Sequence, residues 1–156
     1  MTDITRAQRA ALDSLVTEVG TRRDGTVLLA GAAGEQASRA AETLAASLGV
    51  PVERIDLAAL VSKYIGETEK MLEQLLASAA ASSAVVLFDE ADALFGSRTG
   101  VKDAHDRYAN LETNDLLARI DSYPGLVLLA TNLKTNIDPA FTRRLRRVID
   151  YTPRSR

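Results

Sequence analysis

The chain has 156 residues, of which 46% are hydrophobic, 26% charged and only 4% aromatic, so one domain with an aliphatic interior is expected. The formal net charge of −2 gives no global attraction to nucleic acid or to an anionic membrane, and the absence of Cys excludes disulfides and thiolate chemistry. A single His, His105, argues against a His-rich metal site or a Ser-His-Asp triad, and without a membrane span or signal peptide the sequence predicts a cytoplasmic protein.

Hydrophobic periodicity predicts helices that alternate with short strands. In chain order the predicted elements are helix 4–19, strand 26–30, helix 38–48, strand 52–57, helix 67–80, strand 84–88, helix 108–120, strand 126–130 and strand 148–151. In strand 52–57, Val52, Arg54 and Asp56 face one way. The polar segment 96–106 lacks periodicity and is expected to be irregular, with His105 as a solvated residue.

This alternation predicts βαβ units and a parallel sheet. The runs 27–29, 85–87 and 126–129 are apolar on both faces, as a sheet covered by helices on both sides requires. The predicted fold class is therefore α/β, a three-layer sandwich around a mostly parallel five-stranded sheet.

The turn between the first strand and the second helix lies where a phosphate-binding loop would be expected. The P-loop pattern is Gly, four residues, and then Gly-Lys-Ser/Thr. Gly31 and Ser38 fit this pattern, whereas Gln36 replaces the second Gly and Ala37 replaces the Lys. Glu35 adds a negative charge where a phosphate would lie. By itself this segment is more typical of a plain strand-to-helix turn than of a phosphate-binding loop.

Two adjacent carboxylates, Asp89 and Glu90, follow the buried strand 84–88. Carboxylates at this place are costly unless they hold a cation or polarise water. Asp89 is placed to organise Mg²⁺ and Glu90 to orient an attacking water. The alternative is a solvated helix N-terminus, where acidic residues are favoured by the helix dipole.

At this point the sequence resembles the ATPase core of the AAA family, part of the AAA+ P-loop ATPases, from about Thr26 to Pro153. The motifs that carry the resemblance are Ser62–Lys70 for the aromatic pore loop and its helix, Phe88–Asp92 for Walker B, Ala130–Asn132 for sensor 1, and Ile137–Phe141 with Arg143 and Arg144 for the second region of homology. Within the family, Val101–Asn110 resembles ATPases from clusters that encode phage-tail-like contractile injection systems.

The resemblance implies assembly with other AAA subunits, commonly as a ring, with ATP and Mg²⁺ at the subunit interfaces. The implied roles are Mg²⁺ binding for Asp89 and Ser38, water positioning for Glu90 and Asn132, and arginine fingers that reach a neighbour's nucleotide for Arg143 and Arg144. The implied pore loop, gripping a polypeptide, is Lys63, Tyr64, Ile65 and Gly66. A surface aromatic is the alternative for Tyr64.

The basic cluster formed by Arg143, Arg144, Arg146 and Arg147 lacks the interleaved aromatics of a nucleic-acid surface. We therefore expect neither nucleic acid nor a membrane as partner.

The chain departs from the family pattern at its nucleotide-binding segment, which consists of Gly31, Gly34, Gln36, Ala37 and Ser38. Together with Ala32, Ala33 and Glu35, these residues replace most of the usual Gly-Pro-Pro-Gly-Thr-Gly-Lys. We expect residues 1–25 to be an N-terminal helix and lead-in, 26–153 the AAA core and 154–156 a tail, without the helical lid subdomain that closes over nucleotide.

Two functions of different class follow from the sequence, and an unrelated doubly wound domain with another ligand is a third interpretation. The first is a regulatory or scaffold AAA domain, or an arginine-finger donor, with weak or no ATP hydrolysis of its own. The second is an active ATPase that remodels a polypeptide through a ring pore. Ala37 favours the first, and the retained Glu90 favours the second.

Overall fold

The computed structural model describes residues 6–20, 22–32, 34–92, 115–131 and 143–151. A five-stranded sheet forms the middle layer, with strand order β2-β3-β4-β1-β5 and every adjacent pair parallel. The strands are β1 (Gly25–Ala30), β2 (Val52–Asp56), β3 (Val85–Asp89), β4 (Leu126–Thr131) and β5 (Arg147–Asp150). The predicted α/β class and the predominantly parallel sheet are confirmed.

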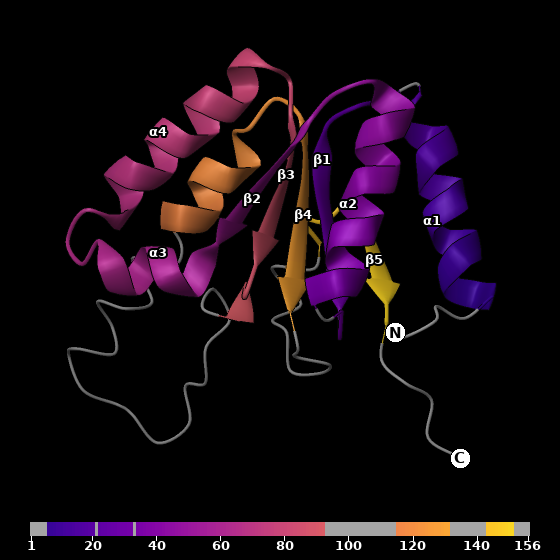
Figure 1. Cartoon of the computed structure of the whole chain (residues 1–156), viewed down its shortest axis with the longest axis horizontal. Coiled ribbons are helices and arrows are strands. Elements are labelled where there is room, and N and C mark those ends of the chain that lie inside the picture. The colour runs from indigo at the N-terminus through magenta and orange to yellow at the C-terminus, as the bar shows by residue number, and fades with distance from the viewer. Residues whose placement is uncertain (1–5, 21, 33, 93–114, 132–142, 152–156) are drawn as a thin grey trace.

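Helices cover both faces of this sheet (Figure 1). The helices α1 (Arg6–Val19) and α2 (Gly34–Leu48) lie on one side. On the other side lie α3 (Leu57–Lys63), α4 (Thr68–Ala81) and the helical residues 115–121. The predicted three-layer sandwich is therefore also correct. None of the helices in the described ranges is both long and apolar enough to cross a membrane.

Two separate hydrophobic clusters hold the three layers together. On the α1 and α2 side, Leu15, Leu44 and Leu87 are completely buried. On the α3 and α4 side, Leu72 and Phe88 are completely buried. Neighbouring residues of β3 thus point into opposite clusters, which is why its sequence is apolar throughout.

Helix α2 begins at Gly34, four residues before the predicted start at residue 38. The prediction began the helix at Ser38, just before the periodic apolar residues that start at Ala40, but the acidic Glu35 is also favoured in a first turn by the helix dipole. Residues 34–37, which the sequence analysis assigned to a loop, are therefore helical.

Helix α3 was not predicted. Asp56 ends β2 and caps this helix, because its Oδ1 accepts a hydrogen bond of 3.0 Å from the Ala59 N–H. At seven residues, α3 is too short for a periodic pattern to stand out.

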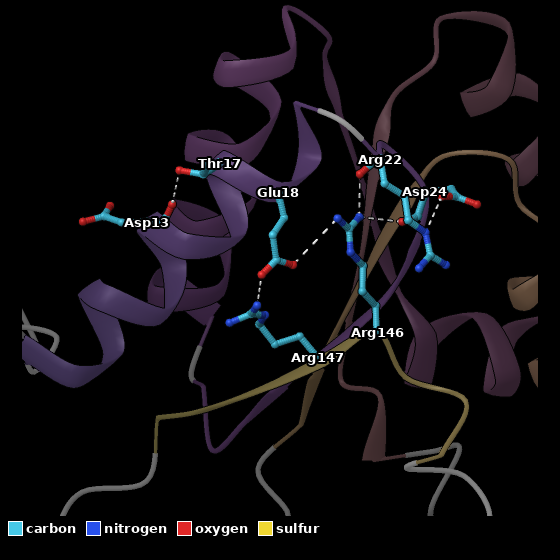
Figure 2. Close-up of polar contacts among 7 residues, drawn as sticks. All are labelled: Asp13, Thr17, Glu18, Arg22, Asp24, Arg146 and Arg147. Atoms are coloured by element: carbon cyan, nitrogen blue, oxygen red, sulfur yellow. Dashed lines mark hydrogen bonds and ion pairs between the residues drawn. The ribbon is translucent and has the colours of Figure 1, made fainter.

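Two arginines of the basic cluster, Arg146 and Arg147, fasten helix α1 and the segment after it to the start of β5 (Figure 2). The Arg146 guanidinium donates to the carbonyl oxygens of Arg22 at 2.6 Å and Asp24 at 2.7 Å. Glu18 of α1 forms an ion pair with Arg147 and lies 3.8 Å from Arg146. These two arginines therefore connect parts of the domain and are not a free surface patch.

The Arg146 side chain is only 6% exposed, and burial lowers the pKa of its guanidinium. A side chain at Gly25 would collide with it, since a Cβ there would lie 2.9 Å from Arg146 Cδ. At the other end of β5, Gln8 Nε2 donates to the Asp150 carbonyl at 3.0 Å. This bond ties the first turn of α1 to the end of the strand.

We expect Arg146→Ala to lower the free energy of unfolding by about 2–3 kcal/mol, or roughly 5–10 °C in Tm, because two carbonyls lose a charged donor whose own side chain is buried. Urea unfolding followed by circular dichroism measures this loss. The exposed Arg23→Ala is the matched control and should change stability by no more than about 0.5 kcal/mol. Equal effects of the two substitutions would contradict a fastening role for Arg146.

Candidate functional site

The candidate site lies at the carboxyl edge of the sheet, where ligands bind in open parallel α/β folds. The strand ends at the lower edge of Figure 1 meet the start of α2 there. Gly31 N–H, just past β1, donates to the Thr131 carbonyl at 2.7 Å. Ala91 N–H, just past β3, donates to the Ala130 carbonyl at 2.9 Å. The ends of β1, β3 and β4 are thus joined by main-chain bonds that hold the predicted motifs side by side.

The connection from β1 to α2 is short. Gly31 has a φ of +80°, a conformation that favours glycine, and only residues 31–33 separate the strand from the helix. Ala37, at the position that a Lys occupies in a P-loop, is completely buried and belongs to the core cluster beneath α2. Gln36 and Ser38 are half-buried. Within the first turn, no cationic side chain is available for a phosphate.

The two predicted carboxylates differ in their surroundings. Asp89 ends β3, and its side chain is 17% exposed. Its Oδ1 accepts a hydrogen bond of 3.0 Å from the Glu90 N–H, and its Oδ2 forms an ion pair with Arg54 of β2. Glu90 is exposed and has a φ of +57°, so the backbone turns sharply at this residue. For a side chain other than glycine such a conformation costs about 1–3 kcal/mol and is concentrated at functional sites.

A side-chain bond links the predicted Walker B segment to the end of β4. Thr131 is buried, and its hydroxyl donates to Asp92 Oδ1. This contact holds the residue that precedes Asn132 against the Asp89–Asp92 turn. Asn132 itself, the predicted sensor 1 residue, lies outside the described residues.

The predicted arginine fingers are both exposed in a turn before β5. Arg144 forms an ion pair with Asp121, at the end of helix 115–121. Arg143 has no side-chain bond to the described part of the chain. Arg144 is therefore held against its own domain, whereas Arg143 is exposed without such a restraint.

The predicted pore-loop residues lie at the end of α3 and directly after it. Lys63 ends this helix, and its Nζ lies 5.5 Å from the centre of the Tyr64 ring, within cation–π range. Tyr64 is half-buried against the α3 and α4 core cluster. Ile65 is 84% exposed, and Gly66 has a φ of +82°. The apolar side chain that faces solvent in this segment is therefore Ile65.

Arg54 is the site residue that sequence reasoning missed. The alternation of β2 placed it on the same face as Asp56, which was correct, but nothing in the local sequence names its partner. The partner comes from the strand register, in which Asp56 lies beside Asp89.

Comparison with known proteins gives this edge of the sheet a family context. The sequence pattern of the ATPase family associated with various cellular activities (AAA) matches residues 27–153. The chain belongs to the AAA family. The matched range includes all five strands except the first two residues of β1, so the AAA domain accounts for the whole sheet.

Similar AAA proteins come from bacteria and eukaryotes. The uncharacterised AAA family ATPase y4kL of Sinorhizobium fredii is 32% identical over 136 residues, covering 86% of this chain and 41% of that protein. The ATP-dependent zinc metalloprotease FtsH 3 of Sphaerobacter thermophilus is 34% identical, over 80% of this chain and 26% of its own length. The 26S proteasome subunit RPT4 of Saccharomyces cerevisiae is 30% identical, over 80% and 30% respectively. The chain thus spans less than half of each of these relatives.

A solved structure, the FIGL-1 AAA domain in complex with ADP, shares the fold with a TM-score of 0.64. It is 24% identical, and the match covers 94% of this chain and 52% of that one. The likeness confirms the P-loop NTPase fold of the AAA+ type that the sequence predicted.

ATPases of the AAA family bind ATP with Mg²⁺, so the fit of these groups to the site can be tested. Position 37 offers a buried methyl group instead of a cation, and Asp89 is already paired with Arg54. The side chains present do not fit Mg-ATP.

We expect Ala37→Lys to lower the free energy of unfolding by about 1–3 kcal/mol, because a long side chain must replace a methyl group in a filled core. Ala46→Lys is the matched control, since Ala46 is exposed on the same helix, and it should be nearly neutral. Chemical denaturation of both variants measures the difference. A stable Ala37→Lys variant would show that the first turn of α2 has room for a P-loop lysine.

Proposed function

We propose that this AAA domain has a degenerate Walker A segment, binds nucleotide weakly or not at all, and acts as a regulatory or scaffold subunit in a AAA assembly. The observation that carries the proposal is the complete burial of Ala37 at the lysine position. Losing a charge-assisted bond to phosphate costs about 1.5–3 kcal/mol, and Glu35 adds repulsion in the first turn. Glu35 is paired with Arg39 at 3.1 Å, but both side chains are more than half exposed, so the pair is weak.

Within such an assembly the domain is suited to donate an arginine to a neighbouring site. Arg143 is exposed, while Arg144 is restrained by Asp121. An arginine supplied in trans stabilises the charge of phosphoryl transfer without any requirement that its own domain bind nucleotide. The oligomeric proteins among the relatives, such as the proteasome subunit, support an assembly of AAA subunits as the setting.

A second function, ATP-driven remodelling of a polypeptide, is favoured by one specific observation. Glu90 is exposed at the end of β3 in a strained conformation, a combination expected of a group that orients an attacking water. The exposed Ile65 next to Tyr64 would be the contact to the polypeptide. Nucleotide binding decides between the two functions.

We expect calorimetric titration of the chain with Mg-ATP to show no binding tighter than about 100 μM. The triple variant Glu35→Thr, Gln36→Gly, Ala37→Lys should bind more tightly, because it restores the phosphate contacts of the P-loop pattern. Micromolar binding by the wild type would overturn the regulatory function in favour of the active one.

If the domain donates an arginine, Arg143→Ala should lower the ATPase rate of an assembly with an ATP-hydrolysing AAA subunit by a factor of about 10³ or more. Arg23→Ala, which removes a different exposed arginine, is the control. The steady-state rate is measured alongside analytical ultracentrifugation, which should show unchanged assembly. A fully active Arg143→Ala assembly would exclude finger donation by this residue.

A further inference from the structure

The positive charge at this site is the guanidinium of Arg54 on β2, whereas a P-loop has a lysine at the start of the helix that follows its first strand. In the register of β2 and β3, Arg54 lies beside Leu87 and Asp56 lies beside Asp89. Paired residues of parallel strands share a face, so Arg54, one pleat before Asp56, lies on the same face as Asp89. From there its guanidinium reaches forward along the face and pairs with Asp89 Oδ2.

The guanidinium also lies against the start of α2. A Cβ added at Gly34 would lie 3.3 Å from Arg54 Nη2 and 3.8 Å from Asp89 Oδ2. The ion pair therefore stands at the junction of the β3 end and the first turn of α2, where the predicted phosphate loop and the predicted Mg²⁺ ligand meet. The helix dipole disfavours a positive charge at a helix N-terminus, so the attraction of Asp89 must hold the guanidinium there.

Each carboxylate oxygen of Asp89 already has one partner within the protein. Oδ1 accepts the Glu90 N–H, and Oδ2 is held by Arg54. The Arg54 side chain is 52% exposed, but that of Asp89 is 17% exposed, so the carboxylate has little access to water. The other arginine near this turn, Arg39, is paired with Glu35 on the exposed side of α2.

We propose that Arg54 is a built-in cation of the site: it neutralises Asp89 and keeps a divalent cation from binding to that carboxylate. This assignment deepens the proposed function and rests on it, because a site that carries its own counter-charge is suited to a domain that works without nucleotide. Arg54 is thus a positioning residue for Asp89.

The test uses Mn²⁺ alone, without nucleotide, on the whole chain. Binding is followed by electron paramagnetic resonance of free Mn²⁺, and Tm is measured in EDTA and in Mn²⁺. The variants are Arg54→Gln, Asp89→Asn and the neutral pair that combines them. Arg39→Gln is the matched control, since it removes an arginine from an ion pair on the other side of the same turn.

We expect Arg54→Gln to bind Mn²⁺ at least about tenfold more tightly than the wild type. Its Tm should be lower than that of the wild type in EDTA and should rise on addition of Mn²⁺. Adding Asp89→Asn should abolish both the gain in binding and the rise in Tm, and Arg39→Gln should behave as the wild type does. Equal Mn²⁺ binding by Arg54→Gln and the wild type would overturn the assignment, as would a gain that survives Asp89→Asn.

If Arg54→Gln does not fold, the neutral pair decides. Recovery of the fold in the neutral pair supports a charge interaction between the two residues, and failure of the neutral pair as well shows that Arg54 acts otherwise than through Asp89. The Mn²⁺ experiment contains no nucleotide, so it is independent of the Mg-ATP titration. Mg-ATP binding by the wild type would overturn the proposed function but would not decide the role of Arg54. Conversely, unchanged Mn²⁺ binding would overturn the role of Arg54 without restoring nucleotide binding.

Discussion

The pairing of β1 between β4 and β5 is the constraint on which the rest of the molecule depends. All six residues of β1 are in register with β4, and four of them are also in register with β5. Because of this pairing, the Gly31 N–H can donate to the Thr131 carbonyl. On the other side of β4, the Ala91 N–H donates to the Ala130 carbonyl. A parallel sheet of this kind must be covered on both faces, and the two core clusters under the helices provide that cover. The positions of the predicted phosphate turn and of Asp89 follow from the same pairing.

The family fold is therefore retained while the charges at its site are arranged differently. A P-loop brings its cation on the helix that follows the first strand, but here that position is a core alanine. The positive charge stands instead on β2 and is directed at the carboxylate of β3. Packing of α2 against the sheet does not require a lysine, and buried Ala37 extends the small-residue face formed by Ala40 and Ala41. Under the proposed function, the domain keeps the AAA architecture while its own site does not take up nucleotide.

Most of the fold could be predicted because the local spacing of apolar residues distinguishes its helices from its strands. The strands of the core, such as β3 and β4, are apolar runs too short for helices, and α4 has an unbroken apolar stripe through Leu72 and Leu76. The start of α2 and the whole of α3 were missed, because an acidic first turn and the Asp56 cap act through single residues instead of a pattern.

The candidate residues at this edge of the sheet could be named from the sequence, but their contacts could not. Asp89 and Glu90 follow a recognisable strand, so their place could be read from the chain. The partners of Arg54 and Arg146 lie 35 and more than 120 residues away in sequence, and only the strand register and the packing of α1 bring them together. Basic residues therefore had the least predictable roles: two of the cluster before β5 fasten α1, and an arginine in β2 takes part in the site.

The most direct measurement is an amide NMR titration of the ¹⁵N-labelled wild-type chain with Mg-ADP, followed at the N–H groups of Gly31, Gly34 and Glu35. The Gly31 amide lies in the connection after β1, and the Gly34 and Glu35 amides lie in the first turn of α2. A phosphate bound in a P-loop would approach both places. If Ala37 and the Arg54–Asp89 pair close the site, their signals should not shift with saturation at concentrations up to about 1 mM. Saturable shifts with a dissociation constant below about 100 μM would contradict the proposal that this AAA domain works without nucleotide.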